Sequence, residues 1–170
     1  HDITCDFGTG NGILPLLLIG RNKGSHFYAF ELLDESAELA KRNVKLNNLE
    51  DRIRIIHDNI SSVSEYLEPC SVDSIICNPP YCHPSSSLTS PNENKAIART
   101  QKTGFLDNAF KAAFTILKGK GKIFLVYPAP QMLFIMKKMQ ENHLEPKRFR
   151  MVYPKVNKPA NLVLIEAIKD

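Results

Sequence analysis

Short apolar runs alternate with longer amphipathic stretches along the chain, and this alternation constrains the fold more than any other feature. The apolar runs are rich in β-branched and aromatic residues and predict strands at residues 3–7, 26–32, 53–57, 74–77, 122–127, 148–153 and 161–168. Helical patterns between most of these runs indicate βαβ units on a parallel sheet. Only residues 154–160 separate the last two strands, too few for a crossover helix, so these strands should be antiparallel neighbours. We therefore expect an α/β, Rossmann-like doubly wound sheet, mostly parallel, with an antiparallel C-terminal hairpin.

Three of the stretches between strands have a clear helical period. Asp34 has the position of an N-cap, and the helix after it should end near residues 47–48. Its expected apolar stripe consists of Ala37, Leu39, Ala40, Val44 and Leu46. Residues 106–117 and 131–140 repeat this pattern and predict two further helices.

The length and composition fit one globular domain. The chain has 170 residues, of which 43% are hydrophobic, and its glycines and prolines are scattered, so we expect residues 1–170 to form a single domain. The longest apolar stretch, residues 13–19, is much shorter than the about 20 residues that cross a bilayer, and no membrane partner is expected. Because His1 leads directly into a strand, we also expect the natural protein to have a segment before it.

The four cysteines form no C-x-x-C pair, which argues against a zinc site and against a disulfide framework. We expect Cys5, Cys70, Cys77 and Cys82 to act as small core hydrophobes in a reducing cytosol. No metal is predicted.

The charge is distributed unevenly along the chain. Residues 1–85 contain 7 basic and 12 acidic residues, a formal charge of −5, whereas residues 86–170 contain 15 and 6, a charge of +9. Between Lys118 and Lys158, ten lysines and arginines stand against Glu141 and Glu145 alone. This pattern favours a basic surface for a polyanion such as nucleic acid, although a solubilising lysine-rich face would have the same composition.

A glycine-rich turn follows the first strand and contains Gly8, Gly10 and Gly12. Residues 6–12, D-F-G-T-G-N-G, allow a ligand to approach the backbone and offer free N–H groups at the start of the next helix. The G-x-G-x-G spacing differs from the G-x-G-x-x-G of dinucleotide folds and favours S-adenosylmethionine over a nicotinamide cofactor. Asp6 should lie near the sulfonium end and hold the cofactor's amino group, and Asn11 belongs to the same cofactor-binding turn.

Acidic residues end the next two strands. Glu31 comes nineteen residues after Gly12, the position from which a carboxylate binds ribose hydroxyls, and Asp58 could accept from the amino group of the cofactor's adenine. Either acid alone could be a helix N-cap or a solvated loop residue. Three successive strand ends with such groups favour one shared cofactor crevice, because ligands of open parallel sheets bind at the carboxyl ends of the strands.

The tetrad Asn78-Pro79-Pro80-Tyr81 follows the fourth strand and is the most specific motif in the chain. A planar amino group has its lone pair delocalised, so an enzyme must orient that lone pair toward the methyl donor. The side-chain oxygen of Asn78 and the carbonyl of Pro79 can each accept one N–H of such an amine. Pro80 fixes the turn, and Tyr81 offers a face on which a planar target can stack. The tetrad predicts methylation of an amino group, with no strong base required.

Three segments resemble the tRNA(Val) adenine-N6 methyltransferase family: residues 6–12, residues 78–81 and residues 161–167, N-L-V-L-I-E-A. The resemblance spans nearly the whole chain and implies a class I methyltransferase fold. It implies cofactor contacts from Asp6, Gly8, Gly10, Glu31 and Asp58, and contacts to the target amine from Asn78, Pro79 and Tyr81. Asn78 is expected to contact both cofactor and amine. The resemblance also implies a cytoplasmic enzyme acting on an adenine beside the anticodon of tRNA.

One segment departs from the family pattern. The family commonly continues with Ala-Arg-His-Glu, whereas here Arg99 is followed by Thr100 and Gln101. We expect residues 91–101 to form a loop that touches or closes over the target nucleotide, with Arg99 among the substrate contacts. The candidate phosphate contacts of the RNA are Lys147, Arg148 and Arg150.

Two other functions remain open on the sequence alone. A protein glutamine methyltransferase of the release-factor-modifying type would use the same tetrad on a planar amide. The basic C-terminal half and residues 161–167 favour RNA. A non-catalytic RNA-binding module would have lost the glycine turn or the tetrad, and both are intact.

Overall fold

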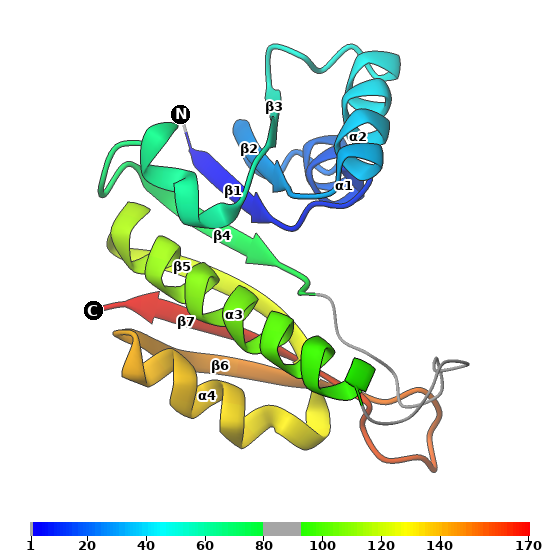
Figure 1. Cartoon of the computed structure of the whole chain (residues 1–170), viewed down its shortest axis with the longest axis vertical. Helices are drawn as coiled ribbons and strands as arrows, with labels where there is room; N and C mark the ends of the chain where they lie inside the picture. Colours follow the sequence, from blue (N-terminus) through cyan, green and yellow to red (C-terminus); the bar gives the residue numbers. More distant parts are fainter. Residues whose placement is uncertain (1, 80–92) are drawn as a thin grey trace.

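The computed structural model describes the backbone of residues 2–79 and 93–170 and the side chains of residues 2–79 and 104–170. The strands are β1 (Ile3–Phe7), β2 (His26–Glu31), β3 (Ile53–His57), β4 (Val72–Cys77), β5 (Leu117–Pro128), β6 (Leu144–Val152) and β7 (Leu162–Lys169) (Figure 1). The helices are α1 (Ile13–Gly20), α2 (Asp34–Leu46), α3 (Glu93–Ile116) and α4 (Met132–Glu141), with 3-10 helices η1 (Ile60–Glu65) and η2 (Ala129–Gln131).

These strands form one sheet in the order β3-β2-β1-β4-β5-β7-β6. Strands β1 to β5 are parallel to one another, and β7 is antiparallel to both β5 and β6. In Figure 1 the arrowheads of β1 and β4 point to the same side of the molecule, whereas that of β7 points to the opposite side. The predicted doubly wound sheet with an antiparallel C-terminal hairpin is confirmed.

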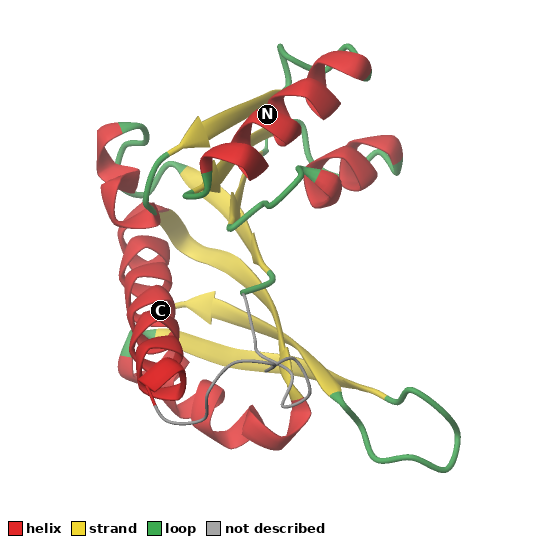
Figure 2. Ribbon diagram, turned by 45° about the vertical axis from the view of Figure 1, so that its right-hand side comes forward, coloured by secondary structure: helices red, strands yellow, loops and turns green. Residues whose placement is uncertain are grey.

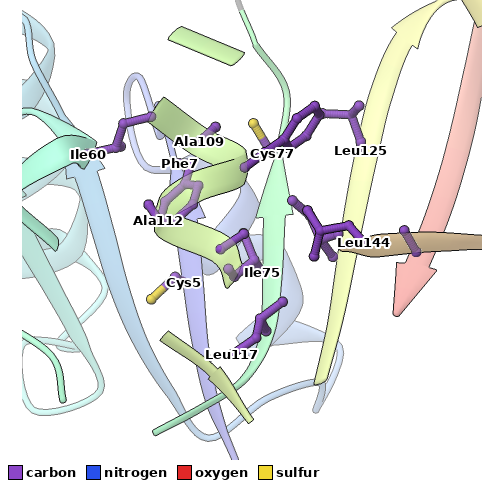
Figure 3. Packing of buried hydrophobic residues seen from close by; sticks show 14 of the residues in the cluster. Cys5, Phe7, Ile60, Ile75, Cys77, Ala109, Ala112, Leu117, Leu125 and Leu144 are labelled. Carbon is purple, nitrogen blue, oxygen red and sulfur yellow. The ribbon is translucent and has the colours of Figure 1, made fainter. Parts of the chain in front are cut away.

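Helices cover both faces of the sheet, and two apolar clusters result (Figure 2). The larger cluster lies between the sheet and α3, α4 and η1. Figure 3 shows Cys5 and Phe7 of β1 and Ile75 of β4 packed with Ala109 and Ala112 of α3. Because strand side chains alternate between faces, the neighbouring residues of these strands face the other side. On that side, Ile19 of α1 and Val44 of α2 pack with Phe27 of β2 and Ile53 of β3 in a smaller cluster.

Helix α2 differs in detail from its prediction. Asp34 is the first helical residue and Leu33 is the N-cap, which makes no side-chain capping bond. Asp34 therefore stabilises the helix as an acidic first-turn residue near its positive end. Ala37, Ala40 and Val44 are buried as expected, but Leu39 and Leu46 are exposed. They lie off the 37–40–44 stripe, so the predicted stripe was too wide.

Helix α3 begins thirteen residues earlier than predicted. Residues 93–105 contain Glu, Lys, Ala, Arg and Gln, which favour helix, but they lack the apolar period on which the prediction depended. The expected loop at residues 91–101 was therefore wrong from residue 93 onward, because that part is helical. The side chain of Arg99 and all of residues 80–92 lie outside the described residues.

Two of the described cysteines are core residues, as predicted. Cys5 and Cys77 are buried in the larger cluster, whereas Cys70 is exposed, contrary to expectation, in a left-handed turn before β4. Cys82 lies outside the described residues. In the part of the chain that the structure describes, none of the helices is long and apolar enough to cross a membrane.

Candidate active site

The turn between β1 and α1 is built on three left-handed glycines. Gly8, Gly10 and Gly12 have φ angles of 74°, 59° and 80°, a region that L side chains rarely adopt. The backbone N–H groups of Gly8 and Thr9 both donate to the carbonyl of Phe30 at 3.0 Å, which ties the turn to β2. The backbone path therefore requires glycine at these alternate positions. The turn ends at Gly12, which is the N-cap of α1.

Glu31 connects this turn to the next strand end. Its Oε2 accepts from the N–H of Gly10 at 2.8 Å, and its Oε1 accepts from the N–H of Leu33 at 3.0 Å. The side chain is therefore fixed, although each carboxylate oxygen keeps a further lone pair for a ligand hydroxyl. Asn11 is exposed, and its Oδ1 accepts from the N–H of Ile13 at 3.2 Å, so it starts α1 beside the same turn.

Asp6 is completely buried beneath the glycine turn. Thr9 Oγ1 donates to its Oδ2 at 2.6 Å, but its Oδ1 is buried and has no hydrogen-bond partner among the described residues. Burial raises the pKa of Asp6 to about 7, the Thr9 bond opposes this shift, and the charge of Glu31 adds to it. A buried acceptor without a donor is costly unless a ligand supplies one.

Asp58 directly follows β3, and its N–H donates to the carbonyl of Glu31 at 3.1 Å. Its Oδ2 accepts from the Tyr66 hydroxyl at 2.8 Å, and its Oδ1 accepts from the Asn59 N–H at 2.6 Å. These two bonds, that of Tyr66 first, lower the pKa of Asp58. Asp58 thus lies beside Glu31 in its ionised form, and it is held by the two residues that flank η1, Asn59 before it and Tyr66 after it.

The tetrad begins at the end of β4, next to the glycine turn. Cys77 is paired with Phe7 in the β1–β4 register, so Asn78 follows β4 at the same level as Gly8 follows β1. Asn78 is exposed, forms no side-chain hydrogen bond within the described residues, and is followed by the buried Pro79. Pro80 and Tyr81 lie outside the described residues.

Strands β1 to β4 place these groups at one edge. Phe7 is paired with Phe30, and Glu31 with His57, so the ends of β1, β2 and β3 are also level. The structure therefore brings the glycine turn, Glu31, Asp58 and Asn78 to the same edge of the sheet, as the motif order predicts.

The predicted phosphate contacts lie elsewhere, on β6. Arg148 forms an ion pair with Glu166 on β7, and Lys122 lies 3.2 Å from the other Glu166 oxygen. Lys147 and Arg150 are exposed and form no ion pair with a described residue. Arg148 and Arg150 line a groove of about 630 Å³ between α1 and the β5–β7–β6 half of the sheet. Arg148 is therefore engaged within the protein, and this distinguishes it from the other two predicted phosphate contacts, Lys147 and Arg150.

Two aromatic residues belong to the site although no motif indicated them. Phe105 of α3 lies against the glycine turn, since a Cβ added to Gly8 would be 3.5 Å from its ring. Tyr66 holds Asp58, and its ring packs edge-on against Phe30, with centroids 5.8 Å apart. Both contacts depend on tertiary packing between elements distant in sequence, and neither residue stands in a recognisable pattern.

Residues 2–147 match the family model of the methyltransferase small domain. The chain belongs to this family. Family members are S-adenosylmethionine-dependent methyltransferases. A curated relative, the tRNA1(Val) (adenine(37)-N6)-methyltransferase of Aliivibrio salmonicida (strain LFI1238), is 32% identical over 123 residues, which cover 72% of this chain and 50% of the relative. The chain spans about half the length of the curated relatives that it matches first.

Two solved structures support the same fold. TrmN from Thermus thermophilus has a TM-score of 0.75 at 17% identity and matches over 99% of this chain and 44% of its own. A structure described as a predicted O-methyltransferase from Agrobacterium tumefaciens has a TM-score of 0.71 at 19% identity, covering 99% of this chain and 74% of its own. At these identities the likeness shows the fold alone, which is the class I methyltransferase fold.

The described residues fit the cofactor of this family. The left-handed glycine turn leaves room for a ligand at its backbone, and nothing lies within 4 Å of a Cβ added to Gly10. Asp6 Oδ1 has no donor among the residues that the structure describes, and the cofactor has a cationic amino group that can supply one. Within the described residues no cluster of potential metal ligands is found.

Proposed function

We propose that this chain is the catalytic domain of an enzyme that transfers a methyl group from S-adenosylmethionine to the exocyclic N6 of an adenine in tRNA. The observation that carries the proposal is the position of Asn78 and Pro79 directly beside the glycine turn, with Cys77 level with Phe7. The names of the first curated relatives, tRNA1(Val) (adenine(37)-N6)-methyltransferases, support tRNA as the substrate.

In this proposal the ends of three strands hold the cofactor. Asp6 Oδ1 accepts from the amino group, the backbone of Gly8, Gly10 and Gly12 with Asn11 surrounds the methionine part, and Glu31 accepts from the ribose hydroxyls. Asp58 accepts from the amino group of the cofactor's adenine and keeps its bond to Tyr66. When bound, the cofactor supplies a methyl group on a positively charged sulfur.

The target amine is held by the tetrad. The Asn78 side-chain oxygen and the Pro79 carbonyl each accept one N–H, which directs the nitrogen lone pair toward the methyl group. As the nitrogen takes the methyl group, the bond from that group to sulfur would break and its electron pair would stay on sulfur, which becomes a neutral thioether. The nitrogen becomes positive, and its surplus proton leaves to solvent, so no protein base is required. Pro80 fixes this turn, and Tyr81 stacks on the target ring. These two assignments rest on the sequence motif.

The remaining proposals concern the setting of the reaction. We propose that residues 1–170 act as one domain, because its larger apolar cluster includes residues from Cys5 to Ala167. The partner is RNA, with Arg99, Lys147, Arg148 and Arg150 as sequence-based contact candidates, and no metal takes part. The cysteines that the structure describes, Cys5, Cys70 and Cys77, are unpaired and fit the proposal of a cytoplasmic enzyme.

A side-by-side methylation assay tests the substrate. The protein is incubated with isotopically labelled S-adenosylmethionine and either unmodified tRNA or a release factor, and the products are digested and analysed by mass spectrometry. We expect labelled N6-methyladenine from tRNA. Labelled methylglutamine without N6-methyladenine would overturn the RNA substrate and leave methyl transfer to a planar amino group intact.

A further inference from the structure

The loop between β6 and β7 emerges at the same edge of the sheet as the tetrad. Strand β5 is parallel to β4, with Leu125 level with Cys77, and it ends with Pro128 paired to Leu162 at the start of β7. The Ala129 N–H donates to the Asn161 carbonyl at 3.0 Å, which fixes the end of this loop beside β5. Figure 2 shows the loop extending away from the sheet.

This loop, residues 153–161, is exposed and basic. Every residue from 153 to 159 is exposed, and Val156 at its tip is 97% exposed. It contains Lys155 and Lys158 and no acidic residue, and it begins with Tyr153, a residue that is 59% exposed. An uncompensated cationic loop with an exposed aromatic ring has the chemistry that holds single-stranded nucleic acid.

Ion pairing separates the cations of the basic half into two groups. Those that pair with a carboxylate are Lys118 with Asp73, Lys122 and Arg148 with Glu166, Lys137 with Glu141, and Lys138 with Asp107. The exposed cations of this half that form no ion pair with a described residue are Lys111, Lys120, Lys147, Arg150, Lys155 and Lys158. A cation already paired within the protein gains little from a phosphate. Of the unpaired cations, Lys155 and Lys158 lie in the loop at the edge of the tetrad and Arg150 lies just before it, so these three form the better phosphate-binding surface.

We propose that the loop of residues 153–161, with Arg150 at its base, holds the phosphates of single-stranded RNA next to the target adenine. The inference rests on the proposed function and assigns its substrate contacts to a defined surface. It also revises the sequence-based candidates, because it removes Arg148 from the phosphate contacts and adds Lys155 and Lys158.

The test compares two double variants that remove equal charge. Lys155→Ala with Lys158→Ala alters the loop, whereas Lys111→Ala with Lys120→Ala removes two exposed lysines that also form no ion pair with a described residue. Lys120 lies in the irregular stretch of β5 between Leu117, paired with Val72, and Lys122, paired with Ser74, at the opposite edge of the sheet from Asn78. Lys111 lies near the end of α3 that leads into β5. A difference between the variants therefore reports position rather than total charge.

For the loop variant we expect weaker tRNA binding with an unchanged Kd for the cofactor. Each phosphate contact to a single strand contributes about 0.7 to the slope of log affinity against log salt, which is about fivefold in affinity at 0.1 M relative to 1 M salt. Loss of two contacts should therefore raise the Kd for tRNA about 25-fold at 0.1 M and lower the slope by about 1.4. The control variant should stay within about twofold of the wild type.

The outcomes separate this inference from the proposed function. If the wild type forms N6-methyladenine in tRNA but the loop and control variants bind tRNA equally, the loop is not the phosphate surface and the proposed function stands. If the wild type methylates a release factor and not tRNA, the proposed substrate is wrong and the inference falls with it.

Discussion

Asp6 has an acceptor oxygen that the described residues leave without a donor, and we expect this to make cofactor binding sensitive to pH. Its pKa of about 7, raised mainly by burial, means that the carboxyl group is largely protonated below pH 7 and ionised above it. A cationic amino group binds the ionised form, so cofactor binding must displace the proton at low pH. Other titratable groups adjoin Asp6: Glu31, Cys5 and Cys77. Burial keeps the pKa of each of these thiols well above 9, so both stay neutral in this range.

We therefore expect the Kd for S-adenosylmethionine to rise about tenfold as the pH falls from 8 to 6, since one proton must leave per bound cofactor. Calorimetric titration at several pH values measures this change. Asp6→Asn should bind weakly and show no such pH dependence. A wild-type affinity that is flat between pH 6 and 8 would remove Asp6 from the contacts to the amino group.

The same group affects the stability of the protein without cofactor. Its folded pKa of about 7 lies above its unfolded value of 3.8, so the folded state holds a proton that the unfolded state has lost between these values. The contribution of Asp6 is thus fully present below about pH 4 and is lost as the pH rises to about 7, on the order of 4 kcal/mol. Urea unfolding should show Asp6→Asn gaining stability relative to the wild type over this range. A constant difference between the two proteins would contradict the assignment.

Asn78 is suited to a clean test of the chemistry. Its side chain is exposed and forms no hydrogen bond within the described residues, so Asn78→Ala should barely change the free energy of unfolding. If its oxygen directs the amine, turnover should fall by orders of magnitude, because this bond strengthens as the nitrogen pyramidalises. Single-turnover kinetics with saturating cofactor measures the loss. Wild-type turnover would show that another acceptor directs the amine.

At the level of elements, we expect the two groove-lining arginines of the β6–β7 hairpin to differ in role, with Arg148 contributing to stability and Arg150 to RNA binding. Arg148 pairs with Glu166, which is 8% exposed and shared with Lys122, whereas Arg150 has no such partner among the described residues. Arg148→Ala should lower the free energy of unfolding only modestly, because the arginine is largely exposed to solvent, and leave the salt slope of RNA binding unchanged. Arg150→Ala is the matched control. It should leave the free energy of unfolding unchanged and lower the salt slope of RNA binding. Denaturant titration measures the stability of both variants, and filter binding measures their salt slopes. A loss of stability in Arg150→Ala together with a lower salt slope in Arg148→Ala would show that the roles are assigned the wrong way round.

The same elements show what could be predicted from the sequence. Apolar runs rich in β-branched and aromatic residues located every strand of the described sheet, although β5 and β6 begin at Leu117 and Leu144, earlier than predicted. The apolar period missed the first turns of α3, which are polar and helix-forming. The left-handed turn positions and the acids at strand ends could be predicted from the sequence, because glycine and acidic residues can be recognised by residue type. Tyr66 and Phe105 could not be found in this way, since their contacts to Asp58 and Gly8 arise only when η1 and α3 pack on the sheet. The pairing of Arg148 also depends on the hairpin register, which places Glu166 opposite it.

In the whole molecule, the acidic and the basic part of the sequence contribute different halves of the sheet. Residues 1–85 form β1 to β4, which occupy one half of the sheet, and residues 86–170 form β5 to β7, which occupy the other. The acidic half, with a formal charge of −5, therefore contains the proposed cofactor site, and the basic half, with +9, contains the proposed RNA surface. A cationic cofactor and a polyanionic substrate would thus meet at the boundary between β4 and β5.

This division predicts different salt responses for the two ligands. Phosphate contacts by Arg150, Lys155 and Lys158 give a slope of about 2.1, so the Kd for tRNA should rise about 20-fold between 50 and 200 mM salt. The cofactor has a net charge near +1 and binds in a partly buried site, so its Kd should change by less than about threefold over the same range. Titrations of each ligand across this salt series measure both slopes. An equally shallow slope for tRNA would mean that few phosphates are neutralised, and recognition would then have to come from the bases and the tetrad rather than from the basic half.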